Sequence, residues 1–147
     1  MILSWNTYSL ELKHPFTISG YSRTTTPVVL TQIKYNNLTG YGEASLPQYL
    51  GESQDSVISF LKKLNLSQFS DPLKLDEILD YIDRVDLGNT AAKASIDIAL
   101  HDLAGKIIGK PLYSIWRLDK DDTPYTTYTI GIDSDVILRK MVKEGDG

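Results

Sequence analysis

Cysteine is absent from this sequence of 147 residues, and the absence removes two classes of structure. Without thiols there is neither a disulfide scaffold nor a thiolate metal site. Positive charge is also scarce, because 15 Lys and Arg face 19 Asp and Glu and form no basic stripe. Binding to a nucleic-acid backbone depends on such a stripe. We therefore expect no nucleic-acid partner, and a small molecule or a protein instead.

Long hydrophobic runs are missing as well. No segment approaches the roughly 18 apolar residues of a membrane span. Residues 1–16 lack the basic segment and the apolar stretch of a secretory signal. These absences predict a cytoplasmic protein with no membrane association. What is present, 41% hydrophobic and 23% charged residues, is typical of a globular domain with enough apolar material for a core.

The first forty-odd residues are patterned as strands. Residues 3–12 alternate in hydrophobicity, with one irregularity after Thr7 that a β-bulge could absorb. Apolar stretches follow at residues 27–35 and 38–44, and the Asn36-Asn37 pair between them suits a hairpin turn. These patterns predict a three-stranded antiparallel meander.

Two segments near the strands are predicted to be irregular. Residues 14–26 are rich in Ser, Thr and Gly and have little to bury, so we expect a long loop, a kind of segment that often carries function. Glu43 lies in a glycine-rich stretch, residues 40–44, which we interpret as a turn leading to a second loop. We expect its carboxylate to bind backbone N–H groups and to have no catalytic role.

Three helices are predicted next. The first is capped by Ser53, the second follows Asp71, and the third extends from a cap at Asn89 or Thr90 to Gly109. The third carries small and apolar residues around most of its circumference, which predicts burial on most sides and close approach of its neighbours.

The last section predicts a strand at residues 125–132 and a helix at residues 135–144, the first half of a strand-helix-strand unit. A single parallel strand has no partner. We therefore expect the sequence to be the N-terminal part of a longer protein.

Two motifs resemble the enolase superfamily: "ALHDLAGKIIGKPLYSIW" at residues 99–116 and "GYGEA" at residues 40–44. The resemblance implies an α+β fold in two parts. Residues 1–115 would form an N-terminal capping domain, in which a three-stranded antiparallel meander precedes helices. Residues 116–147 would form the first strand and helix of a (β/α) barrel.

Three further segments are similar to the dipeptide epimerases of the L-Ala-D/L-Glu type, in the muconate-lactonising subgroup. They are "HPFTISGYSR" at 14–23, "YLGES" at 49–53 and "TYTIGID" at 127–133. The similarity implies an isomerase that carries out Mg²⁺-dependent 1,1-proton transfer at the α-carbon of the C-terminal residue of a dipeptide. This chain would supply the specificity cap.

The same resemblance assigns substrate-binding roles to three residues. Arg23 matches an arginine that meets a carboxylate of the dipeptide, Tyr49 a pocket-wall position, and Thr129 a threonine beneath the substrate. Arginine suits this task because its planar fork binds a carboxylate in bidentate geometry. From the residues alone, a solvated loop residue is the preferred interpretation of Arg23, and only the resemblance reverses it. An exposed tyrosine at Tyr49 and a residue selected for strand propensity at Thr129 fit the residues about as well as the binding roles do.

The resemblance places the catalytic lysines and the Mg²⁺ ligands beyond residue 147, so we predict no catalytic residue and no metal ligand in this chain. Asp97, His101 and Asp102 lie close together in the sequence, but two ligands on one helix face make a weak metal site. We expect Asp97 and Asp102 to be structural hydrogen-bonding partners.

The expected partners are a small-molecule dipeptide, the remainder of the barrel and, in a homo-oligomer, a second copy of the chain. Two alternatives stay open. One is a muconate cycloisomerase or o-succinylbenzoate synthase type enzyme, whose substrates are also carboxylates. The other is a non-catalytic fragment or binding module, because the chain alone contains no base and no metal ligands for the reaction.

Overall fold

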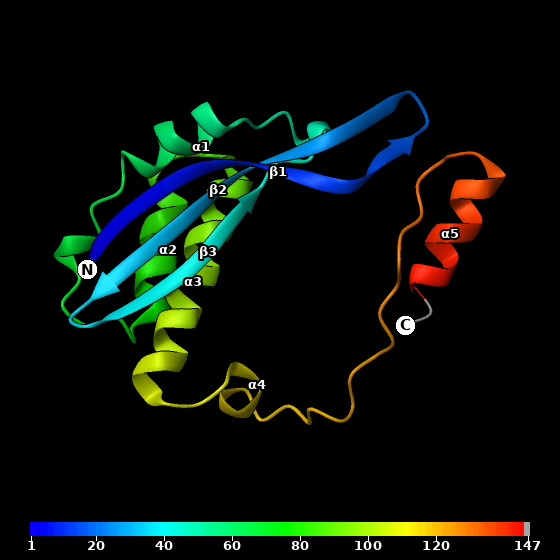
Figure 1. Cartoon of the computed structure of the whole chain (residues 1–147). Helices are drawn as coiled ribbons and strands as arrows, with labels where there is room; N and C mark the ends of the chain where they lie inside the picture. Colours follow the sequence, from blue (N-terminus) through cyan, green and yellow to red (C-terminus); the bar gives the residue numbers. More distant parts are fainter. Residues whose placement is uncertain (146–147) are drawn as a thin grey trace.

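A computed structural model describes residues 1–145 of the chain. In chain order the elements are β1 (Ile2–Ile18), β2 (Tyr21–Tyr35), β3 (Leu38–Ser45), the short 3-10 helix η1 (Gln48–Leu50), α1 (Gln54–Leu61), the 3-10 helix η2 (Leu66–Gln68), α2 (Leu75–Val85), α3 (Thr90–Ile108), α4 (Leu112–Ile115) and α5 (Asp135–Gly145). Figure 1 shows α1, α2 and α3 on one face of the sheet, and a long segment that leads from α4 away from this body to α5. None of the helices in residues 1–145 has the length and apolar composition needed to cross a membrane.

The sheet is the predicted antiparallel meander, with the order β1-β2-β3. Asn36 has a φ of 53° in the turn between β2 and β3, which confirms the predicted hairpin. The loop predicted at residues 14–26 does not form, because β1 and β2 continue through it to a turn at Ser19 and Gly20. We call residues 12–26 the outer hairpin. All of its residues are exposed or half-buried. A strand without a buried face does not need the regular alternation of apolar and polar residues by which strands are identified in a sequence.

The irregularity in β1 lies further along than predicted. Pairing with β2 is regular up to Glu11, which lies opposite Thr25, and resumes at Phe16, opposite Arg23. Across this interval β1 holds three more residues than β2, which is a β-bulge. The change of pattern after Thr7 instead marks where β1 leaves the core, since apolar side chains before it pack against the core and those just after it are half exposed.

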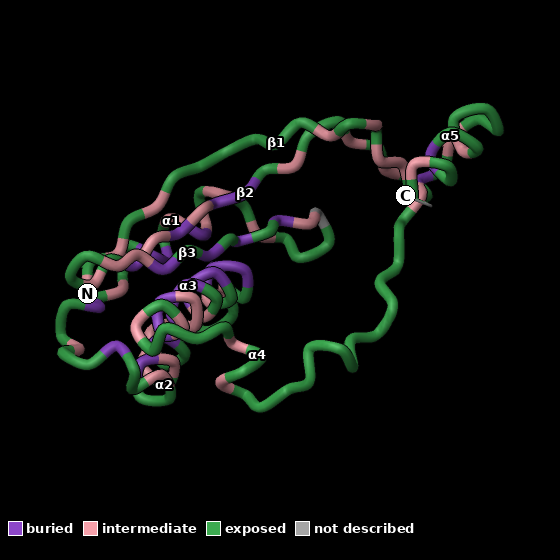
Figure 2. Tube along the Cα trace, turned by 60° about the horizontal axis from the view of Figure 1, so that its bottom comes forward, coloured by how far each residue is buried: buried purple, intermediate pink, exposed green. Residues whose placement is uncertain are grey.

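The core lies between the sheet and α3, where buried residues concentrate (Figure 2). Gly40 and Gly42 lie inside β3 and not in the turn predicted at residues 40–44. A Cβ atom on Gly40 would overlap the carbonyl oxygen of Ala99, and one on Gly42 would overlap that of Ser95. The two glycines therefore let the backbone of α3 lie directly against β3.

α3 is less enclosed than its composition predicts. Ala92, Ile96 and Ala99 are fully buried in the core, and α3 packs on both β3 and α2. Ala94 is exposed, however, and Ile98 is 52% exposed. One side of the helix thus faces solvent.

Helix boundaries follow most of the predicted signals. Ser53 caps α1, and its hydroxyl accepts a hydrogen bond from the backbone N–H three residues on. Gly109, with a φ of 72°, ends α3 as predicted. α2 begins at Leu75 and not directly after Asp71, because the Asp71 carboxylate accepts a hydrogen bond from the N–H of Leu73 (2.9 Å) and stabilises a turn before the helix.

The start of α3 is capped by a residue that the sequence pattern did not identify. Asn89 adopts a left-handed conformation with a φ of 53°, and its side chain makes no cap hydrogen bond. Glu52 instead accepts hydrogen bonds from the Oγ1 of Thr90 (2.7 Å) and the backbone N–H of Ala91 (3.1 Å). A carboxylate at this end also interacts favourably with the helix dipole.

Residues 123–132 are extended but form no strand, which corrects the predicted strand at 125–132. Within residues 1–145, the segment is joined to β1 by one backbone hydrogen bond, from the N–H of Ile132 to the carbonyl of Thr17 (2.8 Å). A barrel strand needs a neighbouring strand to complete its ladder, and the described residues supply none here. The helix predicted after it is present as α5.

Candidate functional site

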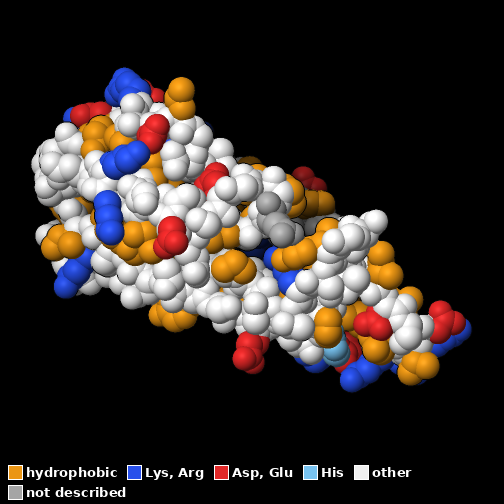
Figure 3. Space-filling view, turned by 90° about the horizontal axis from the view of Figure 1, so that it is seen from above, with side chains coloured by type: hydrophobic (Ala, Val, Ile, Leu, Met, Phe, Trp, Pro, Cys, Tyr) orange, Lys and Arg blue, Asp and Glu red, His pale blue; other side chains and the backbone are white. Residues whose placement is uncertain are grey.

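A cavity of about 390 Å³ lies between the outer hairpin and the loop after β3. Figure 3 looks down on the outer hairpin and shows a hollow with hydrophobic side chains on its sides and a basic side chain within it. The cavity is lined by Phe16, Ile18, Tyr21, Arg23, Pro47 and Tyr49.

The β-ladder accounts for this set of side chains. Phe16 and Ile18 are two residues apart on β1, and Tyr21 and Arg23 are two residues apart on β2, so each pair lies on one face of its strand. The ladder places Phe16 opposite Arg23 and Ile18 opposite Tyr21. Four side chains from one hairpin therefore point to the same side of the sheet and form one wall.

Arg23 brings a positive charge to a largely apolar cavity. Its guanidinium lies over the ring of Phe16, with 5.4 Å between the guanidinium carbon and the ring centroid. Its Nε is buried and has no hydrogen-bond partner within residues 1–145. No carboxylate of these residues forms an ion pair with Arg23. A basic side chain in this condition favours an anionic ligand, because the ligand would supply both the missing acceptor and the missing charge.

Tyr49 forms the opposite edge of the same cavity. It lies on η1, which is closed by a hydrogen bond from the N–H of Leu50 to the carbonyl of Pro47 (3.0 Å). Its side chain is 86% exposed. The structure thus brings together Arg23 and Tyr49, two of the three residues singled out from the sequence.

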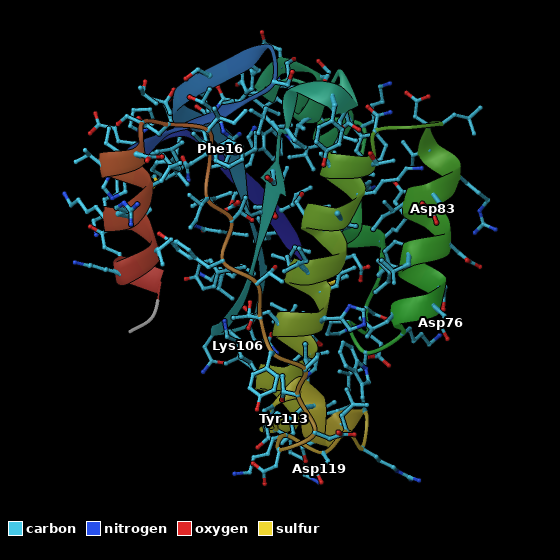
Figure 4. All side chains as sticks on the ribbon, turned by 90° about the vertical axis from the view of Figure 1, so that its right-hand side faces the viewer. Phe16, Asp76, Asp83, Lys106, Tyr113 and Asp119 are labelled. Atoms are coloured by element: carbon cyan, nitrogen blue, oxygen red, sulfur yellow. The ribbon has the colours of Figure 1, made fainter. Side chains whose placement is uncertain are left out.

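Thr129 does not line this cavity. It lies in the extended segment before α5 and is exposed. Gly131, two residues on, lies against the outer hairpin, since a Cβ atom there would be 3.0 Å from the Thr17 carbonyl oxygen and 3.7 Å from the Cα of Phe16. Figure 4 shows Phe16 beside this segment, close to the point where the chain turns into α5.

Sequence reasoning missed Phe16, Ile18 and Tyr21 as cavity residues. A partial signal for them was present, because Phe16 and Ile18 alternate with Thr17 and Ser19 just before a Ser-Gly pair, which is typical of a strand that leads into a hairpin turn. The expected loop obscured that signal.

A charged cluster holds α5 against the outer hairpin. The Nζ of Lys13 and the Nε2 of His14 each lie 2.9 Å from the Oε2 of Glu144. Hydrogen bonds from Lys13 and His14 lower the pKa of Glu144 from 4.5 to about 2. The same carboxylate, mainly through its hydrogen bond, raises the pKa of Lys13. The bulge of β1 and the last turn of α5 are therefore joined by charge.

A larger cavity, of about 660 Å³, lies at the junction of α3 and α4 and is lined in part by Asp97, His101 and Asp102. The Nδ1 of His101 lies 2.6 Å from the Oδ1 of Asp97. Asp102 accepts hydrogen bonds from the N–H of Tyr41 (2.8 Å) and the Nζ of Lys106 (2.6 Å), which confirms a structural role for this carboxylate. Residues 1–145 contain no group of three or more His, Cys, Asp or Glu that could hold a metal ion.

Glu43 differs from its expected role. It is an exposed residue of β3, and within the described part of the chain its carboxylate accepts no hydrogen bond from a backbone N–H. The adjacent glycines explain the motif, since they serve the contact with α3.

Comparison with known protein families matches residues 5–116 to the family "Mandelate racemase / muconate lactonizing enzyme, N-terminal domain". The L-Ala-D/L-Glu epimerase of Bacteroides thetaiotaomicron is 55% identical over 147 residues, which are 100% of this chain and 38% of that protein. The L-Ala-D/L-amino acid epimerase of Maribacter sp. is 36% identical over 96% of this chain and 42% of its own length. The chain therefore spans about 40% of the length of these relatives.

Solved structures of similar proteins have the same fold. The dipeptide epimerase of Enterococcus faecalis V583, complexed with Mg and the dipeptide L-Leu-L-Tyr, gives a TM-score of 0.83 at 26% identity, over 98% of this chain and 42% of that chain. A substrate-liganded complex of the L-Ala-D/L-Glu epimerase from Bacillus subtilis gives 0.80 at 25% identity, over 99% of this chain and 41% of that chain. These similarities confirm the predicted α+β capping fold.

Proposed function

This chain belongs to the mandelate racemase / muconate lactonizing enzyme family, whose N-terminal domain it contains, and from this premise we propose that it is the substrate-capping part of a dipeptide epimerase of the L-Ala-D/L-Glu type. The enzyme would be an isomerase that moves a proton at the α-carbon of the C-terminal residue of the dipeptide. Residues 1–115 would form the cap, and residues 116–147 the start of a (β/α) barrel. Similarity to epimerases along the whole chain supports this assignment.

The observation that carries the proposal is Arg23 in an apolar cavity, with no ion-pair partner among residues 1–145. Its guanidinium would bind a carboxylate of an acidic dipeptide through paired N–H donors. Tyr49 would cover the other edge of the ligand. Apolar walls exclude water and strengthen the attraction between the two charges. The cap would thus select substrates by charge, and Thr129 would act from the barrel side, beneath the substrate.

The described residues do not fit a magnesium site, since they form no cluster of three or more candidate ligands. Mg²⁺ and the catalytic lysines would be held by the barrel that the family resemblance implies. The role of the cap is to bind, orient and enclose the dipeptide.

Arg23→Ala tests the proposal in the protein that joins this cap to its barrel. Epimerisation is followed by exchange of the α-proton in deuterated solvent, with L-Ala-L-Glu and L-Ala-L-Leu as substrates. Loss of a hydrogen-bonded ion pair should lower kcat/KM about 10- to 100-fold for the acidic dipeptide and little for the neutral one. Arg84→Ala, which removes an exposed arginine on α2, is the matched control.

Two outcomes of this assay would contradict the proposal. An equal loss of kcat/KM on both dipeptides would show that Arg23 does not bind the acidic side chain of the substrate. Absence of α-proton exchange with every dipeptide would favour a muconate cycloisomerase or o-succinylbenzoate synthase type enzyme, or a binding module.

Cytoplasmic location and a possible homo-oligomer belong to the same proposal. The absence of cysteine and of a helix in residues 1–145 that could span a membrane is compatible with that location. Cell fractionation tests the first prediction, and the mass of the protein in solution tests the second.

A further inference from the structure

We propose that Phe16 is a positioning residue, whose ring holds the Arg23 guanidinium in the cavity and so contributes to the preference for an acidic dipeptide. The inference rests on the proposed function of Arg23. It adds a residue that does not itself bind the carboxylate but determines where the binding group lies.

The register of the outer hairpin determines which residue faces Arg23. If the regular pairing that places Glu11 opposite Thr25 continued, Lys13 would lie opposite Arg23. Two like charges directly opposite each other in a ladder are destabilising. The bulge moves β1 forward by three residues, and Phe16 takes that position. An aromatic ring thus replaces a second cation.

The displaced charge is neutralised elsewhere. Lys13 forms an ion pair with Glu144 (2.9 Å), and His14 lies at the same distance from the same oxygen. On the other side of Phe16, the carbonyl of Thr17 accepts the hydrogen bond from Ile132 (2.8 Å). The backbone that presents the Phe16 ring is therefore held on both sides by contacts with the segment that includes α5.

The position of the ring leaves the guanidinium available to a ligand. A cation over an aromatic face is attracted by the ring quadrupole, and this attraction uses none of its N–H donors. The buried Nε of Arg23 has no partner within residues 1–145, and no carboxylate there neutralises the charge. Phe16 can therefore fix the orientation of Arg23 without competing for the carboxylate of the substrate.

The test replaces the ring in the full enzyme and measures KM and kcat separately on L-Ala-L-Glu and L-Ala-L-Leu. Phe16→Leu keeps an apolar side chain but removes the quadrupole, and should raise KM for the acidic dipeptide about three- to tenfold. We expect kcat for that dipeptide and both parameters for the neutral one to change less than about twofold. Phe16→Tyr keeps an aromatic ring and should leave KM for the acidic dipeptide close to its value in the unsubstituted enzyme. Tyr8→Leu removes an exposed aromatic side chain from the same strand, outside the cavity, and is the matched control.

Fluorinated phenylalanine at position 16 keeps the inference testable if Phe16→Leu does not fold. One, two and three fluorine atoms progressively weaken the ring quadrupole with little change of shape, so KM for the acidic dipeptide should rise with each substitution. A KM independent of fluorination, or an equal change on both dipeptides, would overturn the role of Phe16. If Arg23→Ala still lowers kcat/KM selectively for the acidic dipeptide, only the positioning role of Phe16 fails. If Arg23→Ala lowers kcat/KM equally for both dipeptides, the proposed function fails as well.

Discussion

Gly42→Ala should destabilise the fold strongly, because the added Cβ meets the backbone of α3. It would overlap the carbonyl oxygen of Ser95 and lie 2.9 Å from the carbonyl carbon of Ser95 and 3.0 Å from the N of Ala99. Neither backbone group can rotate away as a side chain would, so α3 or β3 must shift within the core. Overpacking costs about 1–3 kcal/mol, and we place this substitution at about 3 kcal/mol since two elements must move. For a chain of this size that corresponds to a loss in Tm of about 10 °C.

Thermal unfolding followed by circular dichroism measures the effect, and two neighbouring substitutions separate its causes. Glu43→Ala, an exposed position in the same strand, should change stability by less than about 0.5 kcal/mol. Gly51→Ala, where φ is 68° and a Cβ has open space, should cost about 1 kcal/mol from backbone strain alone. If Gly42→Ala costs no more than Gly51→Ala, close contact of β3 and α3 does not require this glycine and the reasoning fails.

Two further predictions concern charges at helix ends. Glu52→Ala should lower the free energy of unfolding by about 1 kcal/mol, because Thr90 and the first N–H groups of α3 lose their acceptor; an unchanged urea midpoint would contradict this role. The pKa of Glu144 is lowered to about 2 by Lys13 and His14, so its stabilising contribution is complete above pH 4.5 and is lost as pH falls from 4.5 toward 2. Hydrogen-exchange protection of α5 should therefore decrease across this window, and Glu144→Gln should abolish that dependence; identical pH profiles would refute the contact.

Features determined within a few residues could be predicted from the sequence. Ser53 begins α1 and Gly109 ends α3 as expected because capping acts over a single turn of backbone. Asn36 permits the hairpin turn for the same local reason. Arg23 and Tyr49 were identified only through family resemblance, and the cavity that they share depends on chain folding that local patterns do not describe.

Features that depend on a distant partner could not be predicted. Gly40 and Gly42 resemble turn residues until α3 is placed against them. The sequence around a glycine in a turn does not differ from the sequence around a glycine that packs under a helix, so the sequence alone does not distinguish the two. The segment 123–132 has strand composition, but hydrogen bonding to neighbours decides whether it becomes one.

The register of the outer hairpin is the clearest case, since the backbone can pair with Lys13 or with Phe16 opposite Arg23. The two registers differ in their turns, because continued pairing would centre the turn on Ile18, whereas the observed register forms a two-residue turn at Ser19 and Gly20, where Gly20 has a φ of 77°. They also differ in electrostatics: in one register two cations face each other, and in the other Lys13 is paired with Glu144, 131 positions away. An interaction over that separation escapes any short window of sequence. It accompanies the register that places Phe16 against Arg23, so under the proposed function the specificity of the site would depend in part on a contact between distant positions of the chain.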